Sequence, residues 1–359
     1  MANGIPTSAN AILLQNYVDK DVDFSNSPSA TFTLKQIPIP SPLPEDSILV
    51  RTLYLSNDPI QRVWIQKNSK MEIHLAALPL GQPMGSYSLS RVVQVGGSGD
   101  EKFKVGDLVE GPTQWADYAV VNKTKVRVIK TIPGVGISAY LGALGVSGET
   151  VYFAFEEVLK PKKTDTLIIS GAAGAVGNVA IQYAKKVLEV KRVIGIAGSD
   201  EKCNWLKSIG ADAAVNYKSA TFSKDLAAAA PDGIDKFFDS VGGPILDETI
   251  LHMNPHGVIC VVGAMNSYNN PNGGLVLNNY MTLLMRRLSL TAYTLADYYD
   301  RIEEADEKLA LAVTSRKLKV DGAEMIVDVE GKLEEIPRIW NWLFEGKNTG
   351  KLITKVSSE

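Results

Sequence analysis

Hydrophobic positions change their spacing at about residue 138, and this change divides the chain into two regions. In the second region, short apolar runs alternate with stretches in which apolar residues recur every three or four positions. The first pattern is typical of buried strands and the second of helices. The predicted strands cover 167–170, 192–197, 214–217, 236–239 and 258–262, and the predicted helices cover 176–187, 200–208, 246–253 and 301–315. Their alternation predicts an α/β fold with a doubly wound parallel sheet.

The region from 22 to about 133 instead contains short β-branched and aromatic runs between prolines and glycines. Such runs are typical of strands joined by turns, and they predict a β-rich, barrel-like unit. The last 26 residues predict one more helix and a final strand that returns to this unit. We therefore expect two domains, one formed by 1–133 with 320–359 and the other by 134–319. The length of 359 residues agrees with two domains of roughly 150 residues each.

Composition and charge exclude several classes of protein. Hydrophobic residues make up 45% of the chain, charged residues 21%, and the formal net charge is −3. This balance lacks the basic excess of a nucleic-acid-binding protein. The sequence has no apolar run near the ~20 residues that cross a bilayer and no secretory leader pattern. With two cysteines, Cys203 and Cys260, it offers no disulfide framework, so we expect a cytoplasmic protein.

Small residues gather at one predicted strand-to-helix turn, in "TLIISGAAGAVGNVAIQYAKK" (166–186). The spacing is Gly171-x-x-Gly174-x-x-Gly177 rather than the usual Gly-x-Gly-x-x-Gly of dinucleotide-binding folds. A turn without side chains lets the backbone approach a pyrophosphate, and the helix start favours negative charge. Close packing of helix on strand without any ligand is the alternative. In this context the pattern favours a dinucleotide site.

The end of the next predicted strand indicates which dinucleotide binds. NAD sites usually carry an acidic residue there, about 20 residues after the glycines, to bind the ribose 2′-hydroxyl. The corresponding segment is "GIAGSDEK", which has Ser199 at the strand tip and Lys202 one turn into the next helix. A small residue followed by a cation would accept a 2′-phosphate. We therefore predict NADP(H), although an ordinary solvated lysine is the alternative for Lys202.

At this point the chain resembles a known family, the zinc-independent medium-chain dehydrogenase/reductases, and within it the prostaglandin reductases and alkenal double-bond reductases. The resemblance covers most of the chain. Its most specific parts are "GAAGAVGNVAIQYAK", "GIAGSDEK", "AVNYK", "FDSVGG", "VVGAMNSYN", "EGKNTGKLI", "LYLSNDPIQR" and "FKVGDLVEG". It implies a Rossmann domain for the second region and a GroES-like barrel, the catalytic domain, for the first.

The resemblance also implies roles for single residues. Gly174, Ala175, Val176 and Gly177 would line the pyrophosphate, and Ser199, Lys202 and Tyr217 would surround the 2′-phosphate. The nicotinamide half would lie beside the following residues and near Tyr152: Ser240, Val262, Gly263, Ala264, Tyr268, Thr291, Tyr293 and Asn348.

The sequence departs from the family pattern at two positions, Ser240 and Ile60. Ser240 stands where relatives usually carry asparagine, and Ile60 stands where many carry a tyrosine facing the substrate. Zinc alcohol dehydrogenases have a Gly-His-Glu motif where this chain has Gln82, Pro83 and Met84, which do not bind zinc as His and carboxylate do. The three histidines, His74, His252 and His256, are scattered, so we expect no metal.

NADPH without a metal suits reduction of the carbon–carbon double bond of an α,β-unsaturated aldehyde or ketone. Hydride would reach the β-carbon, and the negative charge that develops on the carbonyl oxygen needs a hydrogen-bond donor. The candidate catalytic donors are Tyr268 and Tyr152; the alternative for each is a packed ring whose hydroxyl is bound elsewhere. Rival interpretations are a quinone oxidoreductase, a non-catalytic NADPH-binding module and an accessory enoyl reductase.

The apolar segment "RRLSLTAYT" (286–294) is predicted to lie near the edge of the Rossmann sheet. An unprotected edge of this kind often pairs with a second copy of itself. We therefore predict a homodimer with a small-molecule substrate and no nucleic-acid or membrane partner.

Overall fold

The computed structural model describes residues 4–19, 21–67, 77–97, 102–269 and 276–359, so His74 lies outside the described residues. The chain divides into two compact units. The first comprises Met1–Leu141, Met325–Lys347 and Leu352–Glu359, and the second comprises Gly142–Glu324 and Asn348–Lys351. The chain passes from one unit to the other at 141/142 and at 324/325, eight and five residues after the predicted domain boundaries (141 − 133 = 8; 324 − 319 = 5). The short C-terminal segment Asn348–Lys351 also belongs to the second unit.

The second unit contains a six-stranded sheet in which every neighbouring pair is parallel. Its strand order is β10-β9-β8-β11-β12-β13, so the chain starts in the middle, moves to one edge and then returns to build the other. This is the doubly wound arrangement that the alternating pattern predicts. The strands are β8 (Thr166–Ile169), β9 (Arg192–Ala197), β10 (Ala213–Asn216), β11 (Ile234–Asp239), β12 (Met253–Val261) and β13 (Ser289–Ala292).

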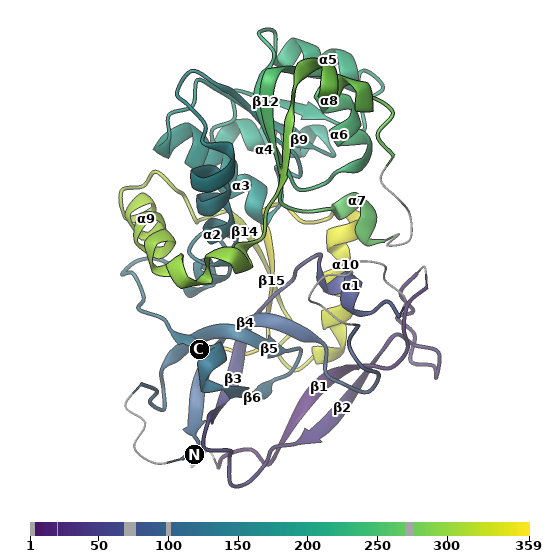
Figure 1. The fold of residues 1–359 in the computed structure, drawn as a ribbon. Helices are drawn as coiled ribbons and strands as arrows, with labels where there is room; N and C mark the ends of the chain where they lie inside the picture. Colours follow the sequence, from purple (N-terminus) through teal and green to yellow (C-terminus); the bar gives the residue numbers. More distant parts are fainter. Residues whose placement is uncertain (1–3, 20, 68–76, 98–101, 270–275) are drawn as a thin grey trace. The chain divides into compact units, whose positions relative to one another are not determined.

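Helices cover both faces of this sheet (Figure 1). The α-helices are α2 (Val146–Phe153), α3 (Ala175–Gln182), α4 (Asp200–Ile209), α5 (Phe222–Ala229), α6 (Gly243–Thr249), α7 (Met265–Tyr268), α8 (Tyr280–Arg286) and α9 (Ile302–Thr314). The π-helical segments η3 (Ala154–Leu159) and η4 (Tyr183–Val187) follow α2 and α3, and the 3₁₀ segments are η5 (Ile250–His252) and η6 (Leu295–Arg301).

Neighbouring strand residues show the two faces directly. Phe237 belongs to an apolar cluster with Leu226 of α5 and Leu246 of α6. The next residue, Phe238, instead meets Phe155 of η3 edge-on, with ring centroids 5.6 Å apart. Because successive side chains of a strand point to opposite faces, β11 is covered on both sides at Phe237 and Phe238.

Two sequence-based boundaries differ most from the structure. The helix predicted over 176–187 is α-helical only to Gln182 and then widens into the π-helical η4. Strand β12 starts at Met253, five residues before the predicted 258. It begins there because Met253 already pairs with Ile234 of β11, and the register then shifts before Val258. His256 lies in this irregular part with φ of 65°.

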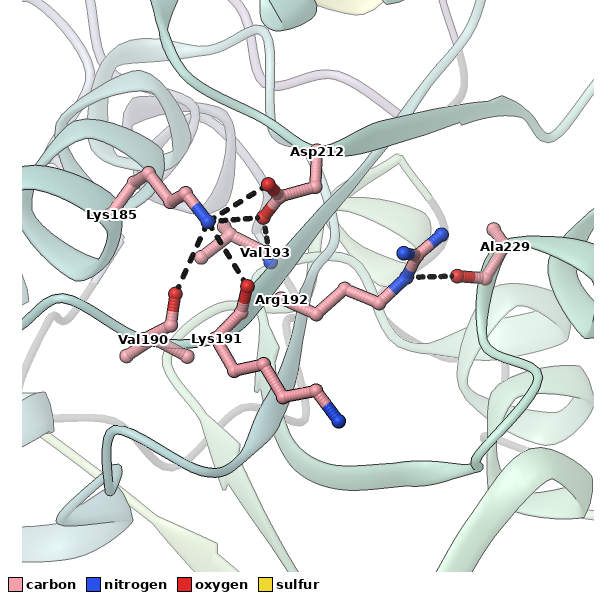
Figure 2. A network of polar contacts seen from close by, with 7 residues as sticks. All are labelled: Lys185, Val190, Lys191, Arg192, Val193, Asp212 and Ala229. Carbon is pink, nitrogen blue, oxygen red and sulfur yellow. Dashed lines mark hydrogen bonds and ion pairs between the residues drawn. The ribbon is translucent and has the colours of Figure 1, made fainter.

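The start of β9 is held by a polar network (Figure 2). Lys185 of η4 donates to the carbonyl oxygens of Val190 (3.4 Å) and Lys191 (3.0 Å) and pairs with Asp212 (2.8 Å). Asp212 in turn accepts the backbone N–H of Val193 at 2.7 Å. The lysine thus binds carbonyl groups that the turn leaves without strand partners, at the end of the sheet opposite to the glycine turn.

The first unit contains a seven-stranded sheet of order β14-β15-β3-β4-β5-β7, with β6 paired to β3, and a separate antiparallel pair β1-β2. It is the β-rich unit that the sequence predicts. Its strands are β1 (Ser8–Leu14), β2 (Phe32–Pro38), β3 (Ser47–Ser56), β4 (Gly85–Val95), β5 (Leu108–Gln114), β6 (Tyr118–Asn122), β7 (Arg127–Val128), β14 (Glu324–Asp328) and β15 (Lys351–Lys355). The helical segments are α1 (Gln61–Trp64), η1 (Lys123–Lys125), η2 (Ile137–Leu141), η7 (Leu333–Glu335) and α10 (Ile336–Glu345).

Aromatic side chains form the centre of this unit. Trp115 and Trp340 are fully buried, and their ring centroids lie 5.8 Å apart in an edge-on arrangement. Phe32 packs on Trp115 at 5.4 Å, so the three rings join β2, the end of β5 and α10. The C-terminal helix therefore returns to the first unit because its apolar face completes that core.

Candidate functional site

The glycine turn lies between β8 and α3. Gly171 has φ of +56°, a left-handed conformation that favours glycine, and its carbonyl accepts the N–H of Gly174 at 2.9 Å. Gly174 is the N-cap of α3 and offers no capping side chain, and Ala175 and Val176 form the first helical positions. A Cβ added to Gly177 would lie 2.5 Å from both Ala172 Cα and Gly171 O. Helix and strand therefore approach too closely at Gly177 for any side chain.

A segment far along the chain joins this turn. The N–H of Gly350 donates to the carbonyl of Ala173 at 2.8 Å, and Gly174 and Gly350 form an isolated parallel bridge. Asn348 is therefore brought to the glycine turn, where it is 7% exposed. Its side-chain amide donates to the carbonyl of Gly350 at 2.9 Å. The structure thus places Asn348 in the same site as Gly174, 174 residues earlier in the sequence (348 − 174).

Three predicted 2′-phosphate residues gather at the ends of β9 and β10. Ser199 caps α4 and accepts the N–H of Lys202 at 3.2 Å. Tyr217 follows β10, and its ring lies within 3.2 Å of where a Cβ on Gly198 would stand. Burial lowers the pKa of Lys202, and the positive charge of Lys218 lowers it further. Sequence analysis did not single out Lys218, although it directly follows Tyr217 in "AVNYK".

Two carboxylates stand near these cations. The Asp200 carboxylate accepts the Asn216 amide at 2.8 Å, and Glu201 partly offsets the shift in the Lys202 pKa. The positive charge of Lys218 disfavours the charged form of Lys202, and a dianion bound beside the two side chains would offset this effect. The arrangement therefore suits a phosphate better than a ribose hydroxyl.

Ser240 lies in the turn after β11. Its N–H donates to Ser170 Oγ at 2.9 Å, while its own Oγ is buried and has no hydrogen-bond partner among the described residues. A buried hydroxyl without a partner costs free energy unless something binds it. The Tyr293 hydroxyl is another of the buried side-chain atoms that have no hydrogen-bond partner among the described residues. Both side chains are predicted cofactor contacts.

The loop after β12 carries Val262, Gly263, Ala264 and Tyr268. The N–H groups of Val262 and Gly263 donate to Asp239 O at 2.7 and 3.3 Å. The hydroxyl of Tyr268, in the short helix α7, accepts the N–H of Ala264 at 3.3 Å. Burial raises the pKa of Tyr268. Burial therefore favours the neutral, protonated form of this hydroxyl.

The remaining predicted residues lie at the end of β13 and in α2. Thr291 is exposed on β13, and the Tyr293 ring stacks on Tyr298 at 5.7 Å. Tyr152 donates its hydroxyl proton to Glu304 Oε1 at 2.6 Å, and burial, followed by this bond, raises its pKa. In the structure, the hydroxyl proton of Tyr152 is therefore engaged by a carboxylate. The role of Tyr152 as a proton donor to a substrate stays a prediction.

The first unit holds the positions that distinguish this chain from zinc enzymes. Met84 is fully buried in the aromatic core, Gln82 is exposed, and Pro83 bridges to Leu13 in β1. Ile60 is the half-buried N-cap of α1. Within the described part of the chain, no three His, Cys, Asp or Glu side chains gather as a metal site.

The second unit fits a phosphorylated dinucleotide in its chemistry. A glycine cradle that a side chain would fill stands at the N-terminus of α3, and Lys202 and Lys218 follow the next two strands. The buried hydroxyl of Ser240 has no hydrogen-bond partner within the part of the chain that the structure describes. A parallel doubly wound sheet with this site defines the class of NADP-binding oxidoreductases.

Comparisons with known proteins narrow this class. Residues 175–311 match the family described as zinc-binding dehydrogenase, and residues 23–129 match the N-terminal domain of oxidoreductase. An NADP-dependent oxidoreductase of Bacillus subtilis is 37% identical, over 91% of this chain and 93% of the relative. A 2-alkenal reductase (NADP(+)-dependent) of Nicotiana tabacum is 35% identical, over 97% of each chain. The crystal structure of CurA in complex with NADPH from Vibrio vulnificus has a TM-score of 0.84 at 29% identity, covering 98% of this chain and 100% of that one.

The chain belongs to the zinc-independent medium-chain dehydrogenase/reductases, with NADP(H) as its cofactor. The predicted fold class, a Rossmann sheet with a β-rich GroES-like domain, is confirmed. None of the described helices has both the length and the hydropathy needed to cross a membrane.

Proposed function

We propose that this protein uses NADPH to reduce the carbon–carbon double bond of α,β-unsaturated aldehydes and ketones. The observation that carries the proposal is the similarity to the tobacco 2-alkenal reductase along the whole chain, at 35% identity. The half-buried, protonated hydroxyl of Tyr268 supports it, because reduction of a conjugated carbonyl requires a donor for the developing enolate oxygen.

Each part of the second unit then has a role. The backbone at Gly174, Ala175, Val176 and Gly177 would hold the pyrophosphate, because the helix N-terminus is positive and no side chain intervenes. Ser199, Lys202 and Tyr217, with Lys218 added, would bind the 2′-phosphate. Ser240, Tyr293 and Asn348 offer hydrogen bonds to the nicotinamide half, with Val262, Gly263, Ala264 and Thr291 lining it.

The chemistry follows from these positions. NADPH supplies the hydride that adds to the β-carbon of the substrate. Tyr268 holds its proton on Oη, where it can hydrogen-bond the enolate oxygen that forms, and the α-carbon then takes a proton from Tyr268 or from water. Burial raises the pKa of Tyr268 and so favours the neutral hydroxyl, which is the form that can donate a hydrogen bond.

A steady-state screen of NADPH oxidation against enals, enones and quinones tests the function. We expect turnover of enals and enones, with the saturated carbonyl as the product. Tyr268→Phe should lower kcat roughly 100-fold, a common effect of losing a positioned acid, with NADPH binding unchanged. Tyr280→Phe is the matched control, because Tyr280 is 65% exposed.

Two results would contradict the proposal. Turnover of quinones without enals or enones would indicate a quinone oxidoreductase. Tight NADPH binding with no turnover of any substrate in the panel would indicate a binding module. A Tyr268→Phe variant with normal kcat would leave the reaction in place but remove the tyrosine from it.

We also propose that the protein is a homodimer formed through β13. This strand ends the sheet, and all four of its residues, Ser289–Ala292, are exposed. Leu290 is 44% exposed, and Leu284 and Met285 of the neighbouring α8 are 65% and 67% exposed. An apolar, unpaired edge of this kind is suited to pairing with an identical edge.

Leu290→Glu tests the dimer by sedimentation. We expect the wild type to sediment as a dimer and the variant as a monomer, because charge on an apolar edge disfavours pairing. Leu311→Glu is the control, since Leu311 is 63% exposed and lies on α9 rather than on β13. A monomeric wild type would contradict the dimer. A Leu290→Glu variant that stays dimeric would place the interface elsewhere.

A further inference from the structure

A carboxylate that does not line the predicted site lies underneath it. Asp239 is the last residue of β11, and none of its surface is exposed. Its Oδ1 accepts Ser170 Oγ at 2.6 Å and the N–H groups of Val241 and Gly242, each at 3.0 Å. Its Oδ2 accepts the Gly242 N–H at 3.1 Å. Each of these donors belongs to a turn at the end of a strand.

Burying a carboxylate is costly unless hydrogen bonds replace its water. Burial raises the pKa of Asp239, and the bonds from Ser170, Gly242 and Val241 act in the opposite direction. An apolar residue would fill this place at lower cost in a sheet that needed only packing. The presence of a carboxylate here is thus best explained by its hydrogen bonds, which hold the turn 240–242 in its conformation.

Ser170 extends the same contact to the predicted cofactor residue. Its Oγ donates to Asp239 and accepts the N–H of Ser240 at 2.9 Å. The end of β8, directly before the glycine turn, is thereby tied to the turn that carries Ser240. With its N–H bound in this way, Ser240 has a fixed backbone, and its Oγ has no hydrogen-bond partner among the residues that the structure describes.

The turn also anchors the loop that carries Tyr268. The carbonyl of Asp239 accepts the N–H groups of Val262 and Gly263, and the carbonyl of Ser240 accepts the N–H of Met265 at 3.2 Å. A Cβ on Gly263 would stand 3.0 Å from Ser240 O, so the two segments pack without space between them. A shift of the turn would therefore also move the helix α7 that begins at Met265.

We propose that Asp239 is a positioning residue for the reaction. Through Ser170 and the turn 240–242, it holds Ser240 in position to contact the nicotinamide half of NADPH. Through the same turn, it holds the loop after β12 in the position that places Tyr268. It touches neither cofactor nor substrate. This inference rests on the proposed contact of Ser240 with the cofactor. Sequence analysis did not single out Asp239, because a strand-end Asp has no spacing that links it to Ser170.

The test compares two isosteric variants on one strand. Asp239→Asn places an amide N–H₂ against the Gly242 N–H, whereas Asp235→Asn changes a carboxylate at the other end of β11. Asp235 accepts the Thr166 N–H at 2.8 Å and the Asn254 amide at 2.8 Å, so it also ties β11 to its neighbours. Both variants are measured well below their melting temperatures.

We expect Asp239→Asn to raise the Kd for NADPH, measured by fluorescence titration, about tenfold, and to lower kcat about tenfold, with the enone KM unchanged. In the protein without cofactor, amide hydrogen exchange of Val241, Gly242 and Val262 should accelerate. Asp235→Asn should leave the Kd and these three amides unchanged. Equal effects of the two variants on the Kd and on these three amides would overturn the proposal.

A double-mutant cycle with Ser240→Ala separates the inference from the function on which it rests. If Asp239 acts through Ser240, Asp239→Asn will weaken NADPH binding much less in the Ser240→Ala background than in the wild type. An unchanged Kd in Ser240→Ala would refute the proposed cofactor contact of Ser240. A weakened Ser240→Ala with fully additive effects would refute the role of Asp239. Should Asp239→Asn not fold, Ser170→Ala removes the acceptor for the Ser240 N–H, and the same cycle is measured with it.

Discussion

Gly177→Ala is expected to lower the free energy of unfolding by about 3 kcal/mol, the upper part of the usual range for overpacking. The added methyl would stand 2.5 Å from Ala172 Cα and Gly171 O and 2.7 Å from Ala172 O. All three are backbone atoms, so the turn or the helix start must move. Because the amides of that helix start are the proposed pyrophosphate site, the Kd for NADPH should rise at least 100-fold. Chemical denaturation and fluorescence titration measure the two effects.

Gly174→Ala is the matched control in the same turn. Its methyl would meet only Gly171 O, at 3.2 Å, and its φ of −87° is accessible to alanine. Stability should fall by about 1 kcal/mol, because alanine is a poorer N-cap than glycine, and this loss is smaller than the one expected for Gly177→Ala. NADPH binding should still weaken, because the methyl stands at the proposed pyrophosphate. Equal loss of stability in both variants, or normal NADPH binding by Gly177→Ala, would contradict this description of the turn.

Lys202→Ala is expected to raise the Kd for NADPH about 100-fold and to leave the Kd for NADH within about twofold. A charge-assisted hydrogen bond is worth roughly 1.5–3 kcal/mol, and 1.4 kcal/mol is a factor of ten in Kd. Lys202 is partly buried beside Lys218, so its charge is less screened than that of an exposed lysine. Titration with both dinucleotides at two salt concentrations measures the selectivity.

Lys207→Ala provides the comparison for this experiment, because Lys207 lies on the same helix, α4, and is exposed. We expect it to bind both dinucleotides as the wild type does. If Lys202→Ala loses affinity for NADPH and NADH equally, the lysine does not contact the 2′-phosphate. If neither Kd changes, the cation lies outside the site.

Elements whose signal is local could be predicted from the sequence. Strand β9 has the bounds 192–197 that its apolar run predicts, and α4 begins directly after the capping Ser199. The glycine spacing at 171–177 identifies the turn because a backbone without side chains is itself the feature. The end of helix α3 was harder to predict from the sequence, since the widening at Tyr183 into a π-helical segment leaves the apolar spacing nearly unchanged.

Contacts between distant residues could not be predicted from spacing. The Tyr152 hydroxyl donates to Glu304, which lies 152 positions later in the sequence, and the residues around neither side chain indicate that hydrogen bond. Asp239 and Ser170 are 69 positions apart and meet because β11 and β8 are adjacent in the sheet. The second cation, Lys218, is brought toward Lys202 by the parallel pairing of β10 with β9.

The sequence by itself determined the class of the second unit, the position of its glycine turn and the cation that favours NADP(H), because each depends on residues within about one strand–turn–helix unit. The tertiary structure decided which distant side chains share that site. It placed Asn348 on the glycine turn, engaged Tyr152 with Glu304 and set Asp239 beneath Ser240. Strand order and the return of the C-terminal segment decide these contacts, and both follow from burial over the whole fold rather than from any short stretch of residues.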